Sequence, residues 1–76
     1  MKIVLNNDSL FINIEGEYDI ENINILKNKV FNILNEYEVE NIFLNTKNAF
    51  LKGSGINSFI KEYKTNYDGK IVVNNR

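Results

Sequence analysis

Residues 10–37 read LFINIEGEYDIENINILKNKVFNILNEY, and the spacing of the apolar side chains changes within this stretch. Over Leu10–Glu15 apolar and polar residues alternate, which is the pattern of a half-buried β-strand. Over Asp19–Tyr37 the apolar residues recur every three or four positions, which is the pattern of an amphipathic helix. We therefore expect a strand that ends at Gly16, followed by a helix.

Shorter patterns predict the other elements. Asn and Asp tolerate positive φ, so Asn7-Asp8-Ser9 is expected to form a hairpin turn. We expect further strands at Lys2–Asn6, Asn41–Asn45 and Lys70–Asn74, a loop at Thr46–Lys52, and a second helix from the Gly53-Ser54-Gly55 break to Lys64. The order ββαβαβ predicts an α/β fold, a mixed sheet with two helices packed on one or both of its faces. Residues 1–76 are expected to form one domain.

The composition excludes several functional classes. The chain has no cysteine and no histidine, so it lacks disulfides, thiolate metal ligands and the commonest general base. No apolar stretch approaches the roughly 20 residues of a membrane helix, and we expect no direct membrane insertion and a cytoplasmic location. The net charge is -1, which does not favour nucleic acid as a partner, although residues 1–40 carry -5 and residues 41–76 carry +4.

Three carboxylates lie between the expected strand and the first helix. Glu15, Glu17 and Asp19 share one side of an extended chain, so their oxygens could hold a divalent cation. The simpler interpretation is a turn assisted by Gly16 with solvated acids, in which Asp19 or Asn22 caps the helix. We follow the simpler interpretation and expect neither a metal site nor a cofactor.

The turn Lys52–Gly55 precedes the second helix. A helix N-terminus presents free N–H groups, and glycines allow a close approach, so this turn could bind an anion. The complete phosphate-loop pattern is absent, however. Two glycines before a helix commonly do no more than interrupt the secondary structure. Ser54 has no histidine to activate it, so we expect no nucleophile and no enzymatic activity.

The segment NTKNAFLKGSGINSFIKEYK, Asn45–Lys64, contains an apolar pair, a short turn closed by glycine and an amphipathic stretch. It is similar to the central motif of the STAS domains of the anti-sigma factor antagonist family. In that family a strand is followed by Asp-Ser-Ser-Gly or Asp-Ser-Thr-Gly and then a helix. Phe50 and Leu51 match the apolar pair, and Gly55 matches the closing glycine.

The segment LFINIEGEYD, Leu10–Asp19, resembles the strand of the same family that ends in Gly-Glu-Leu-Asp. Gly16, Glu17 and Asp19 match directly, and Tyr18 stands in place of leucine. The resemblance covers nearly the whole chain. It implies a STAS-like fold with the element order given above and a function in protein binding.

The departures from the family concern its phosphorylation switch and its length. In many members the serine after the aspartate is phosphorylated by a cognate kinase, which is also the anti-sigma factor. Aligned without gaps, Lys52 replaces the aspartate, Gly53 replaces the acceptor serine, and Ser54 matches the next residue. We therefore expect the usual switch to be absent. Family members usually continue with another helix, a strand and a final helix, so this chain is either a minimal member or a fragment.

The resemblance implies a bacterial regulatory module that binds an anti-sigma factor or a related serine kinase. We expect the partner to contact the turn and the exposed side of the second helix. The predicted partner-binding residues are Lys52, Gly53, Ser54, Gly55, Asn57, Ser58 and Lys61, and the second motif loop supplies Gly16, Glu17 and Asp19. An alternative is a STAS-type accessory subunit of a membrane transport complex, where phosphorylation is often not used.

Self-association is also expected. Without the further elements of the family, part of the sheet lacks a cover, in particular the edge beside Lys70–Asn74. A symmetric dimer is the commonest way to bury such a surface. The sequence therefore favours a homodimer slightly over a monomer.

Overall fold

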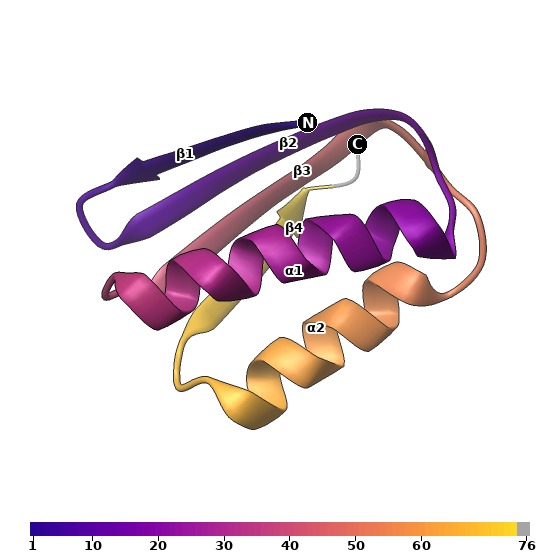
Figure 1. Cartoon of the computed structure of the whole chain (residues 1–76). Coiled ribbons are helices and arrows are strands. Elements are labelled where there is room, and N and C mark those ends of the chain that lie inside the picture. The colour runs from indigo at the N-terminus through magenta and orange to yellow at the C-terminus, as the bar shows by residue number, and fades with distance from the viewer. Residues whose placement is uncertain (75–76) are drawn as a thin grey trace.

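The computed structural model describes residues 1–74, which form six elements in the predicted order ββαβαβ (Figure 1). The elements are β1 (Lys2–Asn6), β2 (Ser9–Tyr18), α1 (Ile20–Glu36), β3 (Asn41–Leu51), α2 (Gly55–Asn66) and β4 (Lys70–Asn74). The α/β class and the mixed sheet with two helices are confirmed. The bounds of β1 and β4 are those predicted from the sequence.

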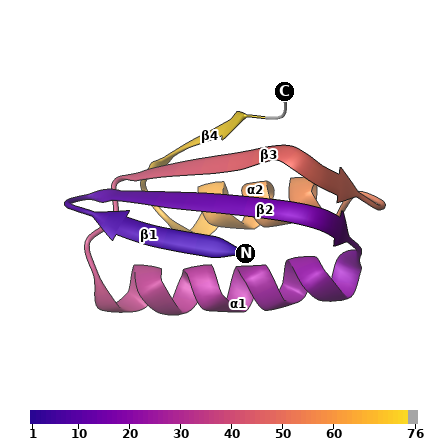
Figure 2. The ribbon, with the colours of Figure 1, turned by 90° about the horizontal axis from the view of Figure 1, so that it is seen from above.

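The four strands form one sheet in the order β1-β2-β3-β4. β1 is antiparallel to β2 through a tight turn, in which Asn7 takes a positive φ of 57° as its side chain permits. β2–β3 and β3–β4 are parallel, and α1 and α2 form the crossover connections. Figure 2 shows that both helices lie on the same face of the sheet, so within residues 1–74 no helix covers the other face.

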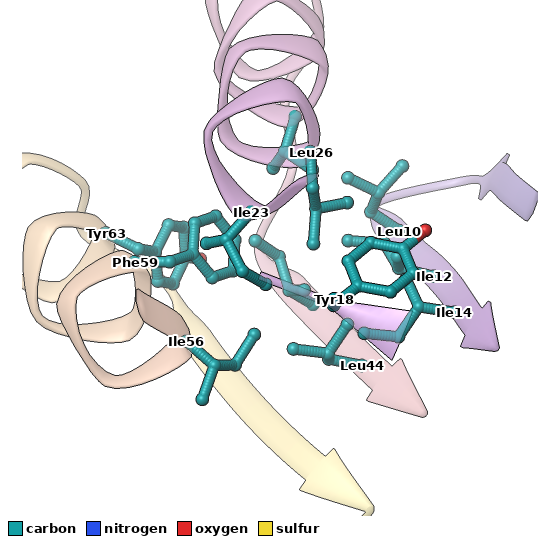
Figure 3. Packing of buried hydrophobic residues seen from close by; sticks show 12 residues of the cluster. Leu10, Ile12, Ile14, Tyr18, Ile23, Leu26, Leu44, Ile56, Phe59 and Tyr63 are labelled. Atoms are coloured by element: carbon teal, nitrogen blue, oxygen red, sulfur yellow. The ribbon is translucent and has the colours of Figure 1, made fainter. Parts of the chain in front are cut away.

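Two rows of apolar side chains line the helix-facing side of the sheet. Strand pairing places them in register, and they are Leu5, Leu10, Ile42 and Ile71 in one row and Ile3, Ile12, Leu44 and Val73 in the other. The helices close the core with Ile23, Leu26 and Val30 from α1 and with Ile56, Phe59 and Tyr63 from α2 (Figure 3). The spacing of two in the strands and of three or four in the helices therefore produces one continuous core.

The predicted ends of the two central strands were wrong. Gly16 does not end β2, because it takes a φ of 86° within the strand and pairs with Ala49. β3 continues to Leu51 through the predicted loop Thr46–Lys52. The physical reason is a bulge in β3, where two residues, 46 and 47, lie opposite the single residue 14.

The bulge hides the second half of β3 from pattern analysis. Before it Ile42, Leu44 and Thr46 face the core, whereas after it Ala49 and Leu51 are the less exposed residues. A strand with an extra residue loses its strict alternation of apolar and polar side chains. The polar run Thr46-Lys47-Asn48 therefore resembled a loop.

The first helix begins with a capping box. Asp19 Oδ1 accepts a hydrogen bond of 3.0 Å from the Asn22 backbone N–H, and Asn22 Oδ1 accepts one of 3.1 Å from the Asp19 N–H. Both residues predicted as alternative caps thus act together. α2 runs to Asn66, two residues beyond the predicted end.

The turn before β4 depends on Gly69. A Cβ atom at this position would collide with the hydroxyl of Tyr63 and lie 3.0 Å from the carbonyl oxygen of Glu40. Tyr63 is fully buried, and its hydroxyl is 3.5 Å from the carbonyl oxygen of Lys70. Burial raises the pKa of this hydroxyl.

We expect Gly69→Ala to lower the free energy of unfolding by about 1–3 kcal/mol, because the new methyl group overpacks this site. Tyr63→Phe removes the colliding oxygen, so the double variant should recover part of the loss in a double-mutant cycle. Urea denaturation measures both effects. Gly55→Ala is the matched control, since its Cβ would meet only ordinary contacts of 3.4 Å with Ile23. Equal losses at the two glycines would contradict the packing described here.

Candidate partner-binding surface

The two motif segments predicted from the sequence lie side by side, at the end of the sheet where β2 and β3 finish. They meet because β2 and β3 are parallel neighbours, with Tyr18 paired to Leu51, so that their carboxyl ends coincide. The backbone N–H of Lys52 donates a hydrogen bond of 2.8 Å to the Tyr18 carbonyl oxygen. The Lys52 Nζ is 2.9 Å from the Glu17 Oε2. Glu17 and Lys52 are both well exposed, so this ion pair orients the turn more than it stabilises the fold.

The turn Lys52–Gly55 has a backbone that favours glycine at its second position. Gly53 has a φ of 79°, in the left-handed region that other residues rarely adopt. Ser54 is the N-cap of α2, but its side chain makes no capping hydrogen bond. Its carbonyl oxygen accepts instead from the N–H groups of Asn57 and Ser58, at 3.1 and 3.2 Å. The hydroxyl of Ser54 is therefore not committed to the helix cap.

A small hollow of about 140 Å³ lies between the beginnings of α1 and α2. The turn, Ile20 and Ser58 line it, together with the Lys27–Glu62 ion pair, whose Nζ and Oε1 are 3.4 Å apart. Sites for small molecules and cofactors usually have volumes of about 300–1,000 Å³. The hollow is therefore better matched to one side chain of a partner protein than to a cofactor.

The remaining predicted binding residues are on α2. Asn57 and Lys61 are exposed and lie one helical turn apart, outside the hollow, whereas Ser58 is exposed and lines it. Gly55 is half-buried against Ile23 of α1. The predicted residues therefore form one continuous strip from the turn along α2.

Two of the three carboxylates predicted in a loop around Gly16 have structural roles, and Glu15 and Glu17 lie within β2 instead of in a loop. Asp19 caps α1 and Glu17 pairs with Lys52. Across residues 1–74 no group of three or more His, Cys, Asp or Glu side chains is placed to hold a metal ion. Between these acids, burial raises the pKa of the Tyr18 hydroxyl, and the charge of Glu15 raises it further.

Two exposed apolar side chains beside the turn were not identified from the sequence. Phe50 is 63% exposed, next to Glu17 in the neighbouring strand, and Ile20 is 65% exposed at the first position of α1. In the sequence Phe50 is recognisable only as part of the apolar pair Phe50-Leu51. Its exposure becomes visible once the bulge is known, because the bulge decides which residues of β3 point outward.

No family model and no curated protein matches the sequence at a significant level. Solved structures do match the fold. The anti-sigma factor antagonist SpoIIAA in its unphosphorylated form has a TM-score of 0.76 and 16% identity, with coverage of 95% of this chain and 69% of that chain. The Bacillus cell fate determinant SpoIIAA in its phosphorylated form gives 0.70 and 16%, with coverage of 93% and 68%.

A third structure, described as Mglu, has a TM-score of 0.83 and 10% identity. It matches 99% of this chain, but this chain spans only about a fifth, 19%, of the Mglu chain. The same fold therefore also occurs inside a much longer protein.

The sheet, its two helices and the paired motif loops define a STAS-type fold. More particularly, the chain has the fold of the anti-sigma factor antagonist SpoIIAA. The resemblance inferred from two short motifs is thus confirmed at the level of the fold. Within residues 1–74, neither helix has the length and apolar character needed to span a bilayer.

We expect Gly53→Ala to lower the free energy of unfolding by about 1–2 kcal/mol, because a Cβ disfavours the left-handed backbone. Gly53→Asn should cost less, since asparagine tolerates this region. Lys52→Ala is the neighbouring control and should change stability by less than about 0.5 kcal/mol. Chemical denaturation of the three variants would test this order, and an unchanged stability in Gly53→Ala would contradict the described turn.

Proposed function

We propose that this chain is a regulatory protein-binding module of the anti-sigma factor antagonist type, acting in transcription regulation in the bacterial cytoplasm and not as an enzyme. The observation that carries the proposal is the contact between the two motif segments, where Lys52 pairs with Glu17 beside the start of α2. The fold shared with SpoIIAA supports the general class. The partner we propose is an anti-sigma factor or a related serine kinase.

The binding surface we propose combines the turn with the exposed side of α2. Lys52 and Lys61 supply positive charge, and Asn57 and Ser58 supply hydrogen-bonding groups. The exposed side chain of Ile20, which lines the hollow beside the turn, offers an apolar contact of the type that contributes to many interfaces. A partner with acidic side chains and one apolar side chain for the hollow would fit this surface.

The module is proposed to work without the usual serine switch. Gly53 occupies the position of the acceptor, and its φ of 79° would strain a serine there. A serine introduced at this position would therefore bring the hydroxyl together with backbone strain. Lys52 also brings a positive charge to the position of the family's aspartate.

Capture of partners from the source cell tests the proposed function. Affinity purification followed by mass spectrometry should retain an anti-sigma factor or serine kinase. Lys52→Ala and Lys61→Ala should each weaken that complex by roughly three- to thirtyfold. Lys29→Ala, which removes the same charge from the exposed side of α1, is the matched control and should bind as the native chain does. Equal losses in all three variants would place binding elsewhere.

Phosphorylation by the captured kinase is a separate test. After incubation with kinase and ATP, mass spectrometry should find no phosphate on the turn, because residue 53 has no hydroxyl. Stoichiometric phosphoserine at Ser54 would contradict this expectation and would identify the adjacent residue as the acceptor. Ser54→Ala is the control that assigns any phosphate observed.

The alternative function is an accessory subunit of a membrane transport complex. It is favoured by the same glycine at position 53, since the usual acceptor serine is missing there. Capture of a transport protein in place of a kinase would support this alternative over the first proposal.

A further inference from the structure

The bare face of the sheet, opposite the helices, has a regular pattern of side chains. We call it the open face, and it is formed by the residues of the four strands that alternate with the core residues. Its middle row is apolar and crosses all four strands, because strand pairing places in register Val4, Phe11, Phe43 and Val72. All four side chains are exposed, Phe11 by 41% and Phe43 by 37%. The row is continuous, unlike the scattered apolar residues of an ordinary surface.

The two central rings already interact with each other. The centroids of Phe11 and Phe43 are 5.1 Å apart, and the ring planes differ by 13°. A shallow concavity of about 250 Å³ lies beside these rings and Val72. The rings and this concavity therefore form an uneven apolar surface, and the side chains of a second apolar row can fill the concavity.

We propose that the open face binds the open face of a second copy of this chain in a two-fold symmetric dimer. The middle row reads Val-Phe-Phe-Val from either edge of the sheet. A two-fold axis along the strands places Phe11 over Phe43 of the partner copy and Val4 over Val72 of the partner copy. The row is thus complementary to itself, as an isologous interface requires.

The charges beside the row permit this symmetry. The flanking rows are Lys2, Asn13, Asn45 and Asn74 on one side and Asn6, Ser9, Asn41 and Lys70 on the other. The two lysines occupy diagonally opposite corners. A two-fold axis along the strands, or along the row, therefore places each lysine opposite an asparagine and avoids contact between like charges.

The size of the face predicts the strength of the dimer. Four strands about 4.8 Å apart, with about 3.3 Å per residue over five residues, present about 320 Å². The longer β2 and β3 add roughly 150 Å². A two-fold axis along the strands places their two carboxylates, Glu15 and Glu17, opposite Asn48 and Phe50 of the partner copy, without contact between like charges. Two copies would bury on the order of 1,000 Å², which is near the lower limit for a specific interface. We therefore expect a weak dimer, with a dissociation constant on the order of 10–100 μM.

The apolar row lies on the face of the sheet and not at the edge that the sequence singled out. The sequence predicted that part of the sheet would lack a cover, in particular the edge beside Lys70–Asn74, and β4 is the last strand in the order of the sheet. The apolar row crosses the whole face, however, whereas an edge contact through β4 would pair only five residues. The face and not the edge therefore carries the proposal.

Sedimentation equilibrium of the 76-residue chain from about 5 μM to about 1 mM is the first test. A monomer–dimer equilibrium is expected. Phe43→Lys should weaken it at least about a hundredfold by burying a charge, and Val72→Lys is a second, less central variant for the same purpose. Ile25→Lys is the control, because Ile25 is 52% exposed on α1 in the helix layer. Circular dichroism verifies that each variant is folded.

Cross-linking tests the geometry, because the chain has no cysteine of its own. Facing sheets lie about 10 Å apart, which is too far for a disulfide but within reach of a short bis-maleimide reagent. This reagent should join mixed Val4→Cys and Val72→Cys chains, whereas Ile25→Cys chains should not be joined. A single species of 8.9 kDa at all concentrations would overturn the proposal. A dimer unaffected by both lysine variants would also overturn it and favour the β4 edge.

The main competing occupant is a single-stranded nucleic acid, whose bases could stack on exposed rings. Adding an unstructured oligonucleotide while recording the NMR signals of the Phe11 and Phe43 rings tests this occupant. Shifts in a chain that stays monomeric would assign the open face to base stacking and overturn the dimer. Unchanged ring signals in the presence of the oligonucleotide, together with the concentration-dependent equilibrium, would support the dimer.

Discussion

The parallel pairing of β2 with β3 is the constraint on which the rest of the structure depends. It is the longest pairing in the sheet and joins segments separated by the whole of α1. It places Leu10 and Ile12 beside Ile42 and Leu44 in the core, and it brings the two motif segments together at the carboxyl ends of β2 and β3. It also stacks Phe11 on Phe43 on the opposite face. Core, turn and open face therefore share one register, and a slip by one residue would disrupt all three.

The sequence predicted those parts of the fold that have uninterrupted periodicity. β1, β4 and both helices were located closely, because their apolar spacing is regular and Asp19 marks a helix start. The ends of β2 and β3 were not predicted, since a glycine with positive φ and a bulge both imitate the signals of a loop. Such irregularities are recognised only from the partner strand, which a single sequence does not reveal.

The candidate site was predicted in part for a similar reason. The turn Lys52–Gly55 and the exposed strip of α2 follow from local sequence. The contact between Lys52 and Glu17 does not, because it joins residues 35 positions apart through the register of β2 and β3. The exposure of Phe50 likewise depends on the bulge upstream of it. The side chains that one segment contributes can be predicted from a sequence. Which segments lie together on one surface depends on the pairing of the strands.

The bulge in β3 has a consequence for comparing this chain with other proteins of the same fold. Residues 46 and 47 occupy the space that one residue fills in a regular ladder, so one residue can be lost here while Ala49 and Leu51 still face inward. The length of β3 can therefore change by one residue at the bulge without turning Ala49 and Leu51 outward. The count backward from Gly55 is fixed by the geometry of the helix start. Alignments of this motif should accordingly be anchored at α2, with any gap placed at the bulge.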